Sequence, residues 1–436
     1  MHQIDESLQE IRKANINAIV AFFESGIKKE SEKIGIELEH TVVKKDACQP
    51  VSYREEQGVK WLLHQLNETY PQTTFDAEGD LIGVAGGFEA VTIEPAAQIE
   101  LSAGPFEDLH EAFRCFENFD HLLESTLEEI DEKVILLGYH PTACVDNLEL
   151  IPKKRYRFMN QYFHKIGPYG SYMMRGSAST QVSIDYHSLE DCLKKLRIAF
   201  ALVPIFSLIC DNSPIFEGKP RKHKLVRTKI WQECDPARCG LVPGVMDDDF
   251  TLYDYAEYIL DTPSILYTCP DEEWCYTEQT FAEIYANKKM EQADVEHALS
   301  MFFNDVRLKT YIEIRPADAL PIPYAISYAA LIKGLFYSTD NLEELDSLFA
   351  GITATDIDRA KNSLMEKGYN ASIYGVSAAS LCDRIIELSY RGLDDDEKSY
   401  LEPLSLLVKQ RMTLADKIEK YACDPNEKSC ALCANL

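Results

Sequence analysis

Two glutamates separated by one residue, Glu37 and Glu39, lie in the stretch IGIELE at residues 34–39. Apolar residues alternate with them, which predicts a β-strand whose side chains point to opposite faces in turn. The two carboxylates then lie side by side on one face, where like charges repel unless a positive partner lies between them. Hard divalent cations prefer carboxylate oxygens, so this pair is a candidate magnesium site.

A second pair of acids lies in VTIEPAAQIELS at residues 91–102, with Glu94 before Pro95 and Glu100 after it. Proline cannot donate a ladder hydrogen bond, and in sheets it is found at edges and bulges. We therefore expect a bent or bulged pair of strands that carries both acids.

Two later stretches, residues 177–186 and 310–316, also alternate between polar and apolar side chains. Their polar faces carry Ser179, Gln181, Ser183 and Asp185 in the first stretch and Tyr311, Glu313 and Arg315 in the second. Taken alone, each strand could have a solvated face, as antiparallel sheets commonly do. If all four stretches share one sheet, they form a concave surface with five carboxylates and an amide oxygen. Mg²⁺ with a bound nucleotide would stabilise that surface, and Arg315 would contact phosphate.

The chain is strongly acidic, with a net charge of −28 from 72 Asp and Glu against 44 Lys and Arg in 436 residues. This balance argues against binding to nucleic acid or to an anionic membrane surface, since both require a basic surface. No apolar run reaches the ~18 residues of a membrane-spanning helix. The N-terminal stretch is charged throughout and lacks the apolar core of a signal peptide, so we expect a cytoplasmic protein.

Thirteen cysteines are scattered along the chain. In a cytoplasmic protein free thiols are the expectation. Cys423, Cys430 and Cys433 include one C-x-x-C pair, but a structural zinc site usually needs a second pair or two histidines. We expect no metal there.

Hydrophobic periodicity divides the chain in two. Residues 1–337 mix helical and strand patterns and predict an α+β catalytic unit, whereas residues 338–436 predict helices alone, packed on that unit. The expected helices of the first unit span residues 3–30, 54–68, 106–130, 189–210, 251–260, 277–286 and 321–337. The expected strands span residues 34–43, 78–84, 89–94, 97–102, 133–140, 177–186 and 308–315.

Seven blocks, in order, carry a resemblance to a known family. They are IGIELEH (34–40), IEPAAQIELSAGPFEDLHE (93–111), IPKKRYRFMNQYF (151–163), MMRGSASTQVSIDY (173–186), NSPIFEG (212–218), VRTKIWQECDPARCGLVPGVMDDDF (226–250) and FNDVRLKTYIEIRPADALP (303–321). Over roughly residues 30–330 the chain resembles the plant and bacterial glutamate–cysteine ligases. The resemblance implies a curved, mainly antiparallel sheet that forms a funnel flanked by helices, as in glutamine synthetase.

The same resemblance implies a reaction. ATP would phosphorylate the γ-carboxylate of L-glutamate, and the amine of L-cysteine would attack the acyl phosphate, giving γ-glutamylcysteine in the first step of glutathione biosynthesis. Phosphoryl transfer needs positioning and charge neutralisation more than a nucleophilic side chain. The ligands implied for two or three Mg²⁺ ions are Glu37, Glu39, Glu94, Glu100, Gln181 and Glu313. Gln181 stands where distant relatives have histidine.

Roles for cationic residues follow from the resemblance as well. Arg315, with Glu313, looks catalytic, because it resembles the arginine that contacts the transferring phosphate; a simple ion pair between the two is the alternative. Arg227 resembles the arginine that holds the substrate α-carboxylate, and Arg238 is a weaker substrate-binding candidate. The candidates for binding the nucleotide are Lys153, Arg155 and Arg315, with a plain basic loop as the alternative for the first two.

Two alanines, Ala96 and Ala97, stand where the family often has glycines, and alanine takes a positive φ only at a cost. The segment MMRGSASTQ also departs from the plant pattern. Both departures leave the amine acceptor open, so a ligase with another acceptor is the first alternative. A non-catalytic acidic binding protein that retains the fold is the second. A monomer and a homodimer are both compatible with the sequence.

Overall fold

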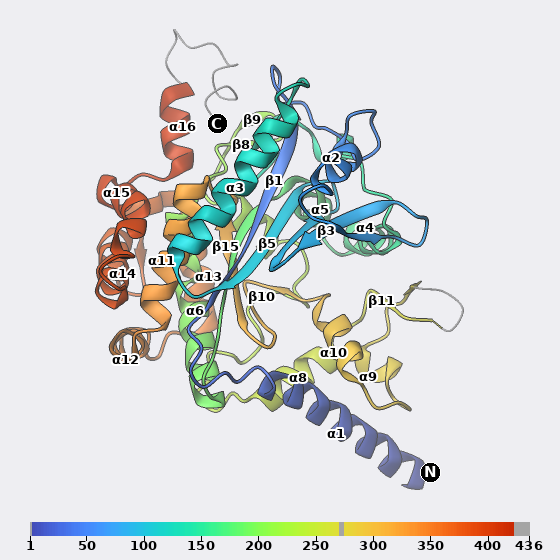
Figure 1. Cartoon of the computed structure of the whole chain (residues 1–436). Coiled ribbons are helices and arrows are strands. Elements are labelled where there is room, and N and C mark those ends of the chain that lie inside the picture. Colours follow the sequence, from blue (N-terminus) through green and yellow to red (C-terminus); the bar gives the residue numbers. More distant parts are fainter. Residues whose placement is uncertain (1, 270–273, 423–436) are drawn as a thin grey trace.

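A curved antiparallel sheet forms the centre of the computed structural model, which describes residues 2–269 and 274–422 (Figure 1). Nine described strands form this sheet in the order β14-β15-β7-β1-β5-β4-β3-β2, with β6 also pairing to β1. The sheet strands are β1 (Ile34–Lys44), β2 (Gln72–Phe75), β3 (Leu81–Gly86), β4 (Glu89–Ile93), β5 (Ile99–Phe106), β6 (Glu132–Ile135), β7 (Ser179–Ile184), β14 (Val306–Leu308) and β15 (Ile312–Asp318). The expected mixed fold with an antiparallel sheet is confirmed.

Alternation along β1 gives the sheet two different faces. Ile34, Ile36 and Leu38 are buried on one face, as expected for a strand of period two. Strands β7 and β15 continue this apolar face with Val182 and Ile314, which are paired in register. The opposite face carries the polar side chains of the same strands.

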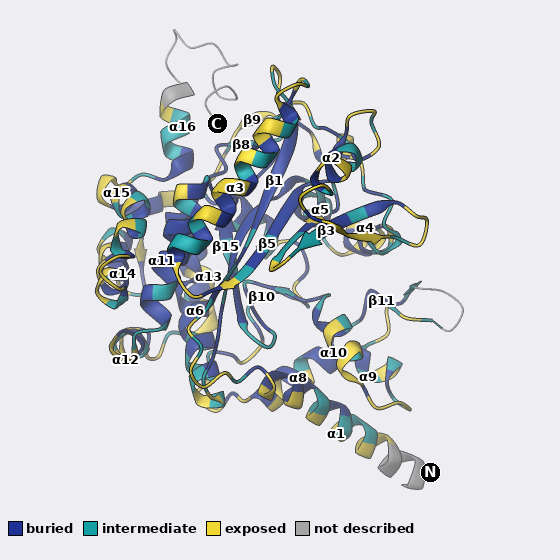
Figure 2. Cartoon of the chain, in the orientation of Figure 1, coloured by how far each residue is buried: buried dark blue, intermediate teal, exposed yellow. Residues whose placement is uncertain are grey.

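Long helices cover the apolar face. They are α3 (Leu109–Leu127), α6 (Leu189–Ile209) and α11 (Ile322–Phe336), and most of α6 and α11 is buried (Figure 2). The N-terminal α1 (His2–Glu24) packs against α8 (Leu252–Asp261) and α10 (Gln292–Leu299). No described helix is long and apolar enough to cross a membrane.

Short helices on the other side of the sheet were missed by periodicity. They are α4 (Lys154–Ile166), α5 (Gly170–Gly176) and α7 (Val226–Gln232), and α10 was missed too. The predicted helix at residues 277–286 shortens to α9 (Phe281–Ile284), while the predicted helix at 54–68 is α2 (Val59–Leu66). The buried side of α4 consists of Tyr156, Met159, Tyr162 and Phe163, and charged residues between them obscured this helical spacing in the sequence.

Residues 339–422 are mainly helical, as predicted, apart from a small hairpin of β16 (Ser372–Ile373) and β17 (Val376–Ser377). Its helices are α12 (Thr339–Leu348), α13 (Ala354–Lys367), α14 (Ala378–Gly392), α15 (Glu402–Gln410) and α16 (Leu414–Ala422). Helices α12, α14 and α15 pack on both α6 and α11, and α13 packs on α6; one continuous apolar core joins these helices to the sheet. The residues Cys423, Cys430 and Cys433 lie outside the described residues.

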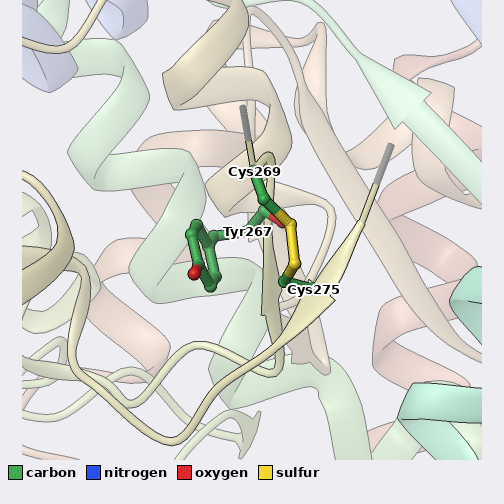
Figure 3. Close-up of a disulfide and its surroundings, with 3 residues drawn as sticks. All are labelled: Tyr267, Cys269 and Cys275. Atoms are coloured by element: carbon green, nitrogen blue, oxygen red, sulfur yellow. A yellow bond between two sulfur atoms is a disulfide. The ribbon is translucent and has the colours of Figure 1, made fainter. Parts of the chain in front are cut away.

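Two cysteines correct the expectation of free thiols. Cys269 and Cys275 form a disulfide with a Cα–Cα distance of 5.9 Å (Figure 3). The hairpin of β11 (Leu266–Tyr267) and β12 (Cys275–Tyr276) pairs Tyr267 with Cys275, and this pairing brings the two sulfurs within reach. The remaining small pairs are β8 (Ile215–Phe216) with β9 (Lys219–Pro220) and β10 (Cys239–Gly240) with β13 (Phe303–Asn304).

Candidate active site

A cavity of about 900 Å³ opens over the polar face of the sheet. Strands β1, β5 and β7 form its floor, and α4, α5 and α7 contribute to its walls. Most of the predicted site residues line it, namely Glu37, Glu39, Glu94, Glu100, Lys153, Arg155, Gln181, Arg227 and Arg315. A cavity of this size accommodates a nucleotide together with small substrates.

Strand register brings the acids together. Glu39 lies directly opposite Glu100, and Glu37 lies directly opposite Gln181 on the other neighbouring strand. Directly opposed residues in an antiparallel pair have side chains on one face about 5 Å apart. Glu94 joins them from the turn after β4, where its backbone N–H donates to the carbonyl of Gln98 at 2.9 Å. The four stretches with acidic faces therefore share one sheet, as predicted.

Four cavity carboxylates resist ionisation. Burial, and then repulsion from Glu39, raises the pKa of Glu94 to about 7. Burial raises the pKa of Glu100 well above its usual range, and Glu37 and Glu94 add to that effect by repulsion. Burial also raises the pKa of Glu37 and Glu39. The cavity therefore holds clustered acids that need cations to stay charged.

These acids fit a hard divalent cation shared with a ligand. Across residues 2–269 and 274–422, no three His, Cys, Asp or Glu side chains form a ready-made metal centre. Mg²⁺ usually binds through one or two carboxylates and takes its remaining oxygens from substrate phosphates and water. The opposed pair Glu39 and Glu100 is a donor set of that kind, with Glu37 and Glu94 beside it.

Glu313, a predicted metal ligand, is not among the residues that line the cavity. It is fully buried behind the residues that line the cavity, and three cations hold its carboxylate. Arg307 donates at 2.7 Å and Arg315 at 2.8 Å to one oxygen, while Lys309 donates at 2.8 Å to the other. These cations lower the pKa of Glu313 well below its usual range despite its burial. In this structure Glu313 therefore orients cations beside the cavity, and its role as a metal ligand stays a prediction.

Arg315 lies on the cavity wall between two partners. Its Nη1 donates to Glu313 Oε2 and to the amide oxygen of Gln181. The amide nitrogen of Gln181 faces Glu39 at 3.4 Å. In this arrangement the oxygen of Gln181 holds the arginine, so a cation bound through that oxygen would have to share it. Arg315 therefore lines the cavity and pairs with Glu313, and its contact with phosphate stays a prediction.

The cations of α4 lie near Glu94. Lys153, at the N-cap of α4, and Arg155 both favour its ionised form. Arg155 donates to the carbonyl and hydroxyl of Ser300 at 2.8 and 2.9 Å. Lys153 lies over the ring of Tyr156 with its ammonium 5.0 Å from the ring centre. This end of the cavity is therefore positively charged next to an acid, as an end that binds phosphates would be.

The structure places Arg227 and Arg238 in different surroundings. Arg227 lines the cavity, is buried, and donates to the carbonyl of Ala317 at 2.8 Å, while its Nε has no partner among the described residues. An orphaned buried donor next to a cavity fits a carboxylate ligand. Arg238 is fully buried, and its guanidinium binds Asp235 at 2.6 Å and Tyr162 at 2.9 Å. We correct its substrate-binding assignment, because these contacts hold it within the core of the protein.

Other cavity residues escaped sequence reasoning. Arg307 and Lys309 line the cavity beside Arg315, and Arg307 lies directly opposite Glu313 in the hairpin of β14 and β15. The stretch RLKTYIEIR contains that hairpin, and charges of opposite sign at paired positions could have revealed it. The aromatic residues Trp231 and Trp274 also line the cavity, and nothing in their local sequence indicates this.

In the turn that contains Ala96 and Ala97, Ala97 adopts the left-handed conformation that glycine favours. Ala97 has φ of +68°, and its N–H donates to the carbonyl of Glu94 at 2.9 Å. A left-handed alanine costs about 1–2 kcal/mol, more than the ~0.5–1 kcal/mol that glycine costs in entropy. We therefore expect Ala97→Gly to raise the free energy of unfolding by about 0.5 kcal/mol. Ala96→Gly, at negative φ, should lower it, and denaturant titrations of both variants give the comparison. Equal losses in the two would contradict the strain argument.

The acid cluster predicts a pH effect on the ion-free protein. Glu94 binds a proton more tightly when folded than when unfolded, so its contribution to stability falls as pH rises towards and through 7. His140, whose burial lowers its pKa to about 4, acts in the opposite direction only below about pH 6.5. Between pH 6.5 and 8 we expect the melting temperature in chelator to fall by about 1–3 °C. Glu94→Gln should flatten this slope; a slope unchanged in that variant would exclude Glu94 as its source.

The fold matches a solved enzyme. It is similar to the glutamate–cysteine ligase of Francisella tularensis, solved in complex with AMP, with a TM-score of 0.58 and 11% identity. The match covers 94% of this chain and 88% of that one. At this identity the likeness concerns the fold, which is that of the glutamate–cysteine ligase class.

Sequence comparison identifies the family. The model of glutamate–cysteine ligase family 2 matches residues 33–431, so the chain belongs to that family. The chloroplastic glutamate–cysteine ligase of Arabidopsis thaliana is 30% identical over 414 residues, 92% of this chain and 78% of that one. The chloroplastic glutamate–cysteine ligase B of Oryza sativa subsp. japonica is 28% identical over 428 residues, 95% of this chain and 85% of that one.

Proposed function

We propose that this protein is an ATP-dependent ligase that joins the γ-carboxylate of L-glutamate to the amine of L-cysteine through a γ-glutamyl phosphate. The observation that carries the proposal is the cavity, where four clustered carboxylates lie between cations contributed by different elements. Membership of the family supports the choice of substrates. Clustered acids flanked by cations suit the transfer of a phosphoryl group more than acid–base chemistry alone.

The cavity residues would have different roles according to their positions. Lys153 and Arg155 would bind the nucleotide end beside Glu94, and Arg315 would stabilise charge on the transferring phosphoryl group. Glu37, Glu39, Glu94 and Glu100 would hold Mg²⁺, which would neutralise phosphate charge. Burial in the cavity strengthens these electrostatic interactions, because little water screens them.

Arg227 would bind the α-carboxylate of glutamate. Its attraction to Glu39 and Asp318 keeps it beside the acid cluster, and its orphaned Nε is available to a ligand. Lysine cannot reproduce a two-pronged contact with carboxylate. Arg227→Lys is expected to raise the KM for glutamate by about 10–100-fold and to change the KM for ATP less than about threefold. Steady-state kinetics with each substrate varied give both values, and equal losses would indicate a structural role.

The test of the proposed reaction is ADP release with ATP, Mg²⁺ and glutamate against a panel of amines, with products identified by mass. Fastest turnover with cysteine and a γ-glutamylcysteine mass are the expected results. A faster reaction with another amine would keep the phosphoryl chemistry and replace the acceptor. If no amine supported ADP release, the proposed reaction would be contradicted, and an acidic binding protein would be favoured.

Magnesium as the ion and the cytoplasm as the location are part of the proposal. Mg²⁺ is supported by the carboxylate donors and by the way it shares ligands with phosphate. Replacement by Ca²⁺, which is larger and less strict in geometry, should lower turnover. The cytoplasmic location stays a prediction, and the plant relatives are named chloroplastic.

A further inference from the structure

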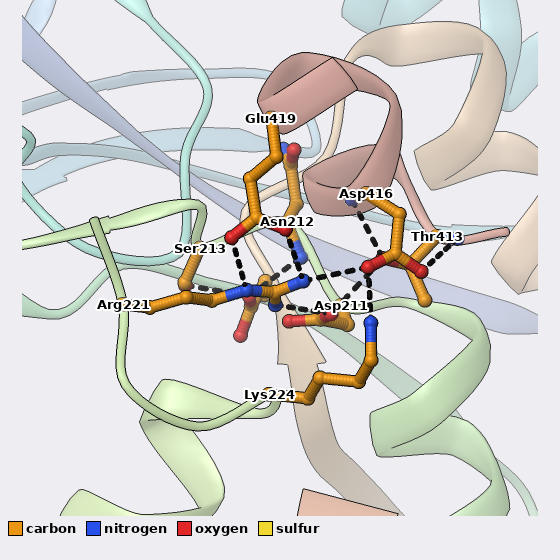
Figure 4. A network of polar contacts seen from close by, with 9 residues as sticks. Asp211, Asn212, Ser213, Arg221, Lys224, Thr413, Asp416 and Glu419 are labelled. Atoms are coloured by element: carbon orange, nitrogen blue, oxygen red, sulfur yellow. Dashed lines mark hydrogen bonds and ion pairs between the residues drawn. The ribbon is translucent and has the colours of Figure 1, made fainter. Parts of the chain in front are cut away.

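An ion cluster with a buried centre joins the last described helix to the segment that leads into α7. Arg221, whose side chain is 2% exposed, donates to Asp211 at 2.5 Å, to Asp416 at 2.9 Å and to Glu419 at 2.8 Å (Figure 4). Asp416 and Glu419 belong to α16, and Lys224 also pairs with Asp416. We call these five residues the α16 cluster.

The α16 cluster fixes the start of α7 through the backbone. The N–H of Lys224 donates to the carbonyl of Met365 in α13 at 3.1 Å, so this residue is held by two helices of the C-terminal region. Leu225, the N-cap of α7, has a left-handed φ of +56°. A non-glycine residue keeps that conformation only where its surroundings enforce it. Arg227 follows two residues later.

A second connection reaches Arg227 from the other side. Asp211 is followed by Asn212 and Ser213, which donate through N–H and hydroxyl to the carboxylate of Asp318, each at 2.7 Å. The other oxygen of Asp318 lies 3.8 Å from Arg227. Asp211, which binds Arg221, and the two residues that orient Asp318 thus belong to one continuous segment.

Stability alone does not account for the α16 cluster. Burying several charges is costly, and well-packed apolar residues often stabilise such a place equally well. Networks of charged residues do hold their neighbours in a fixed geometry. A fixed geometry favours substrate binding, because a small displacement of a binding group lowers the affinity strongly. Resting on the proposed function, we propose that Asp416 and Glu419, acting through Arg221, are positioning residues that set α7 so that Arg227 receives the substrate carboxylate.

The double variant Asp416→Asn/Glu419→Gln tests this role in the full chain. It leaves Arg221 with Asp211 as its buried partner. We expect the KM for glutamate to rise about tenfold, while kcat and the KM for ATP change less than about threefold. Asp416→Glu/Glu419→Asp, which keeps the charges, should stay closer to the wild type. If the neutral double variant fails to fold, Glu419→Gln alone should raise the KM for glutamate about threefold.

A substrate-free measurement separates this proposal from the proposed reaction. Trp231 lies on α7, so in a background with Trp61→Phe and Trp274→Phe its fluorescence reports the setting of that helix. The neutral double variant should shift this emission. Asp383→Asn is the control, since it breaks the exposed Arg411–Asp383 pair in the same helical region away from α7. An unshifted emission, or equal increases in the KM for both substrates, would overturn the positioning role. A wild-type protein that ligates no amine would overturn the reaction alone.

Discussion

Arg315→Met is expected to lower turnover by about 10³-fold with a smaller change in the KM for ATP. Two neighbouring side chains orient Arg315 in the cavity, because Glu313 and Gln181 both accept from its Nη1. An arginine held in this way is preorganised, so it can stabilise charge on the transferring phosphoryl group without first reorienting. Methionine keeps the length of the stem and removes the charge.

The fold should survive this substitution. Glu313 keeps Arg307 and Lys309 as partners, so its carboxylate is not left uncompensated. Single-turnover measurements separate chemistry from nucleotide binding, and Arg359→Met, an exposed arginine of α13, is the matched control. A loss below about tenfold, or a loss confined to the KM for ATP, would contradict the assignment of Arg315 to the phosphoryl group.

The acidic face of the sheet could be predicted because strand periodicity is a local property. Glu37 and Glu39 alternate with apolar residues, so their shared face follows from the order of the residues alone. The pairings of Glu39 with Glu100 and of Glu37 with Gln181 depend on register between strands distant in sequence. Sequence reasoning considered that the strands could share a sheet, but it did not predict these pairings.

Two charged residues show why sequence reasoning stopped short. Arg238 looked available, but Tyr162 of α4 binds it within the core, and Glu313 lies in a hairpin whose pairing brings Arg307 and Lys309 onto its carboxylate. The sequence gives the sign of the charge on each side chain, whereas the contacts in the folded protein determine which charges are neutralised. The disulfide between Cys269 and Cys275 was missed for the same reason, since a hairpin pairing brings them together.

Glu313→Gln is expected to lower the free energy of unfolding by about 3–5 kcal/mol, since it leaves buried cations without their central anion. Arg307, Lys309 and Arg315 all bind this carboxylate, and a neutral amide can accept from them but cannot offset their mutual repulsion. Denaturant titration of the ion-free protein measures the loss. Turnover should fall too, because Arg315 loses one of the two groups that aim it.

Glu37→Gln is the matched comparison, because Glu37 lines the same cavity from the neighbouring part of the sheet. Burial and repulsion from Glu313 raise its pKa, so its ionised form destabilises the ion-free protein at neutral pH. Removing that charge should therefore raise stability in chelator and weaken the response to Mg²⁺. If Glu313 is a metal ligand like Glu37, Glu313→Gln should also weaken the response to Mg²⁺. An unchanged response to Mg²⁺ in that variant would assign Glu37 to the ion and Glu313 to the cations alone, and a weakened response would support the ligand assignment of Glu313.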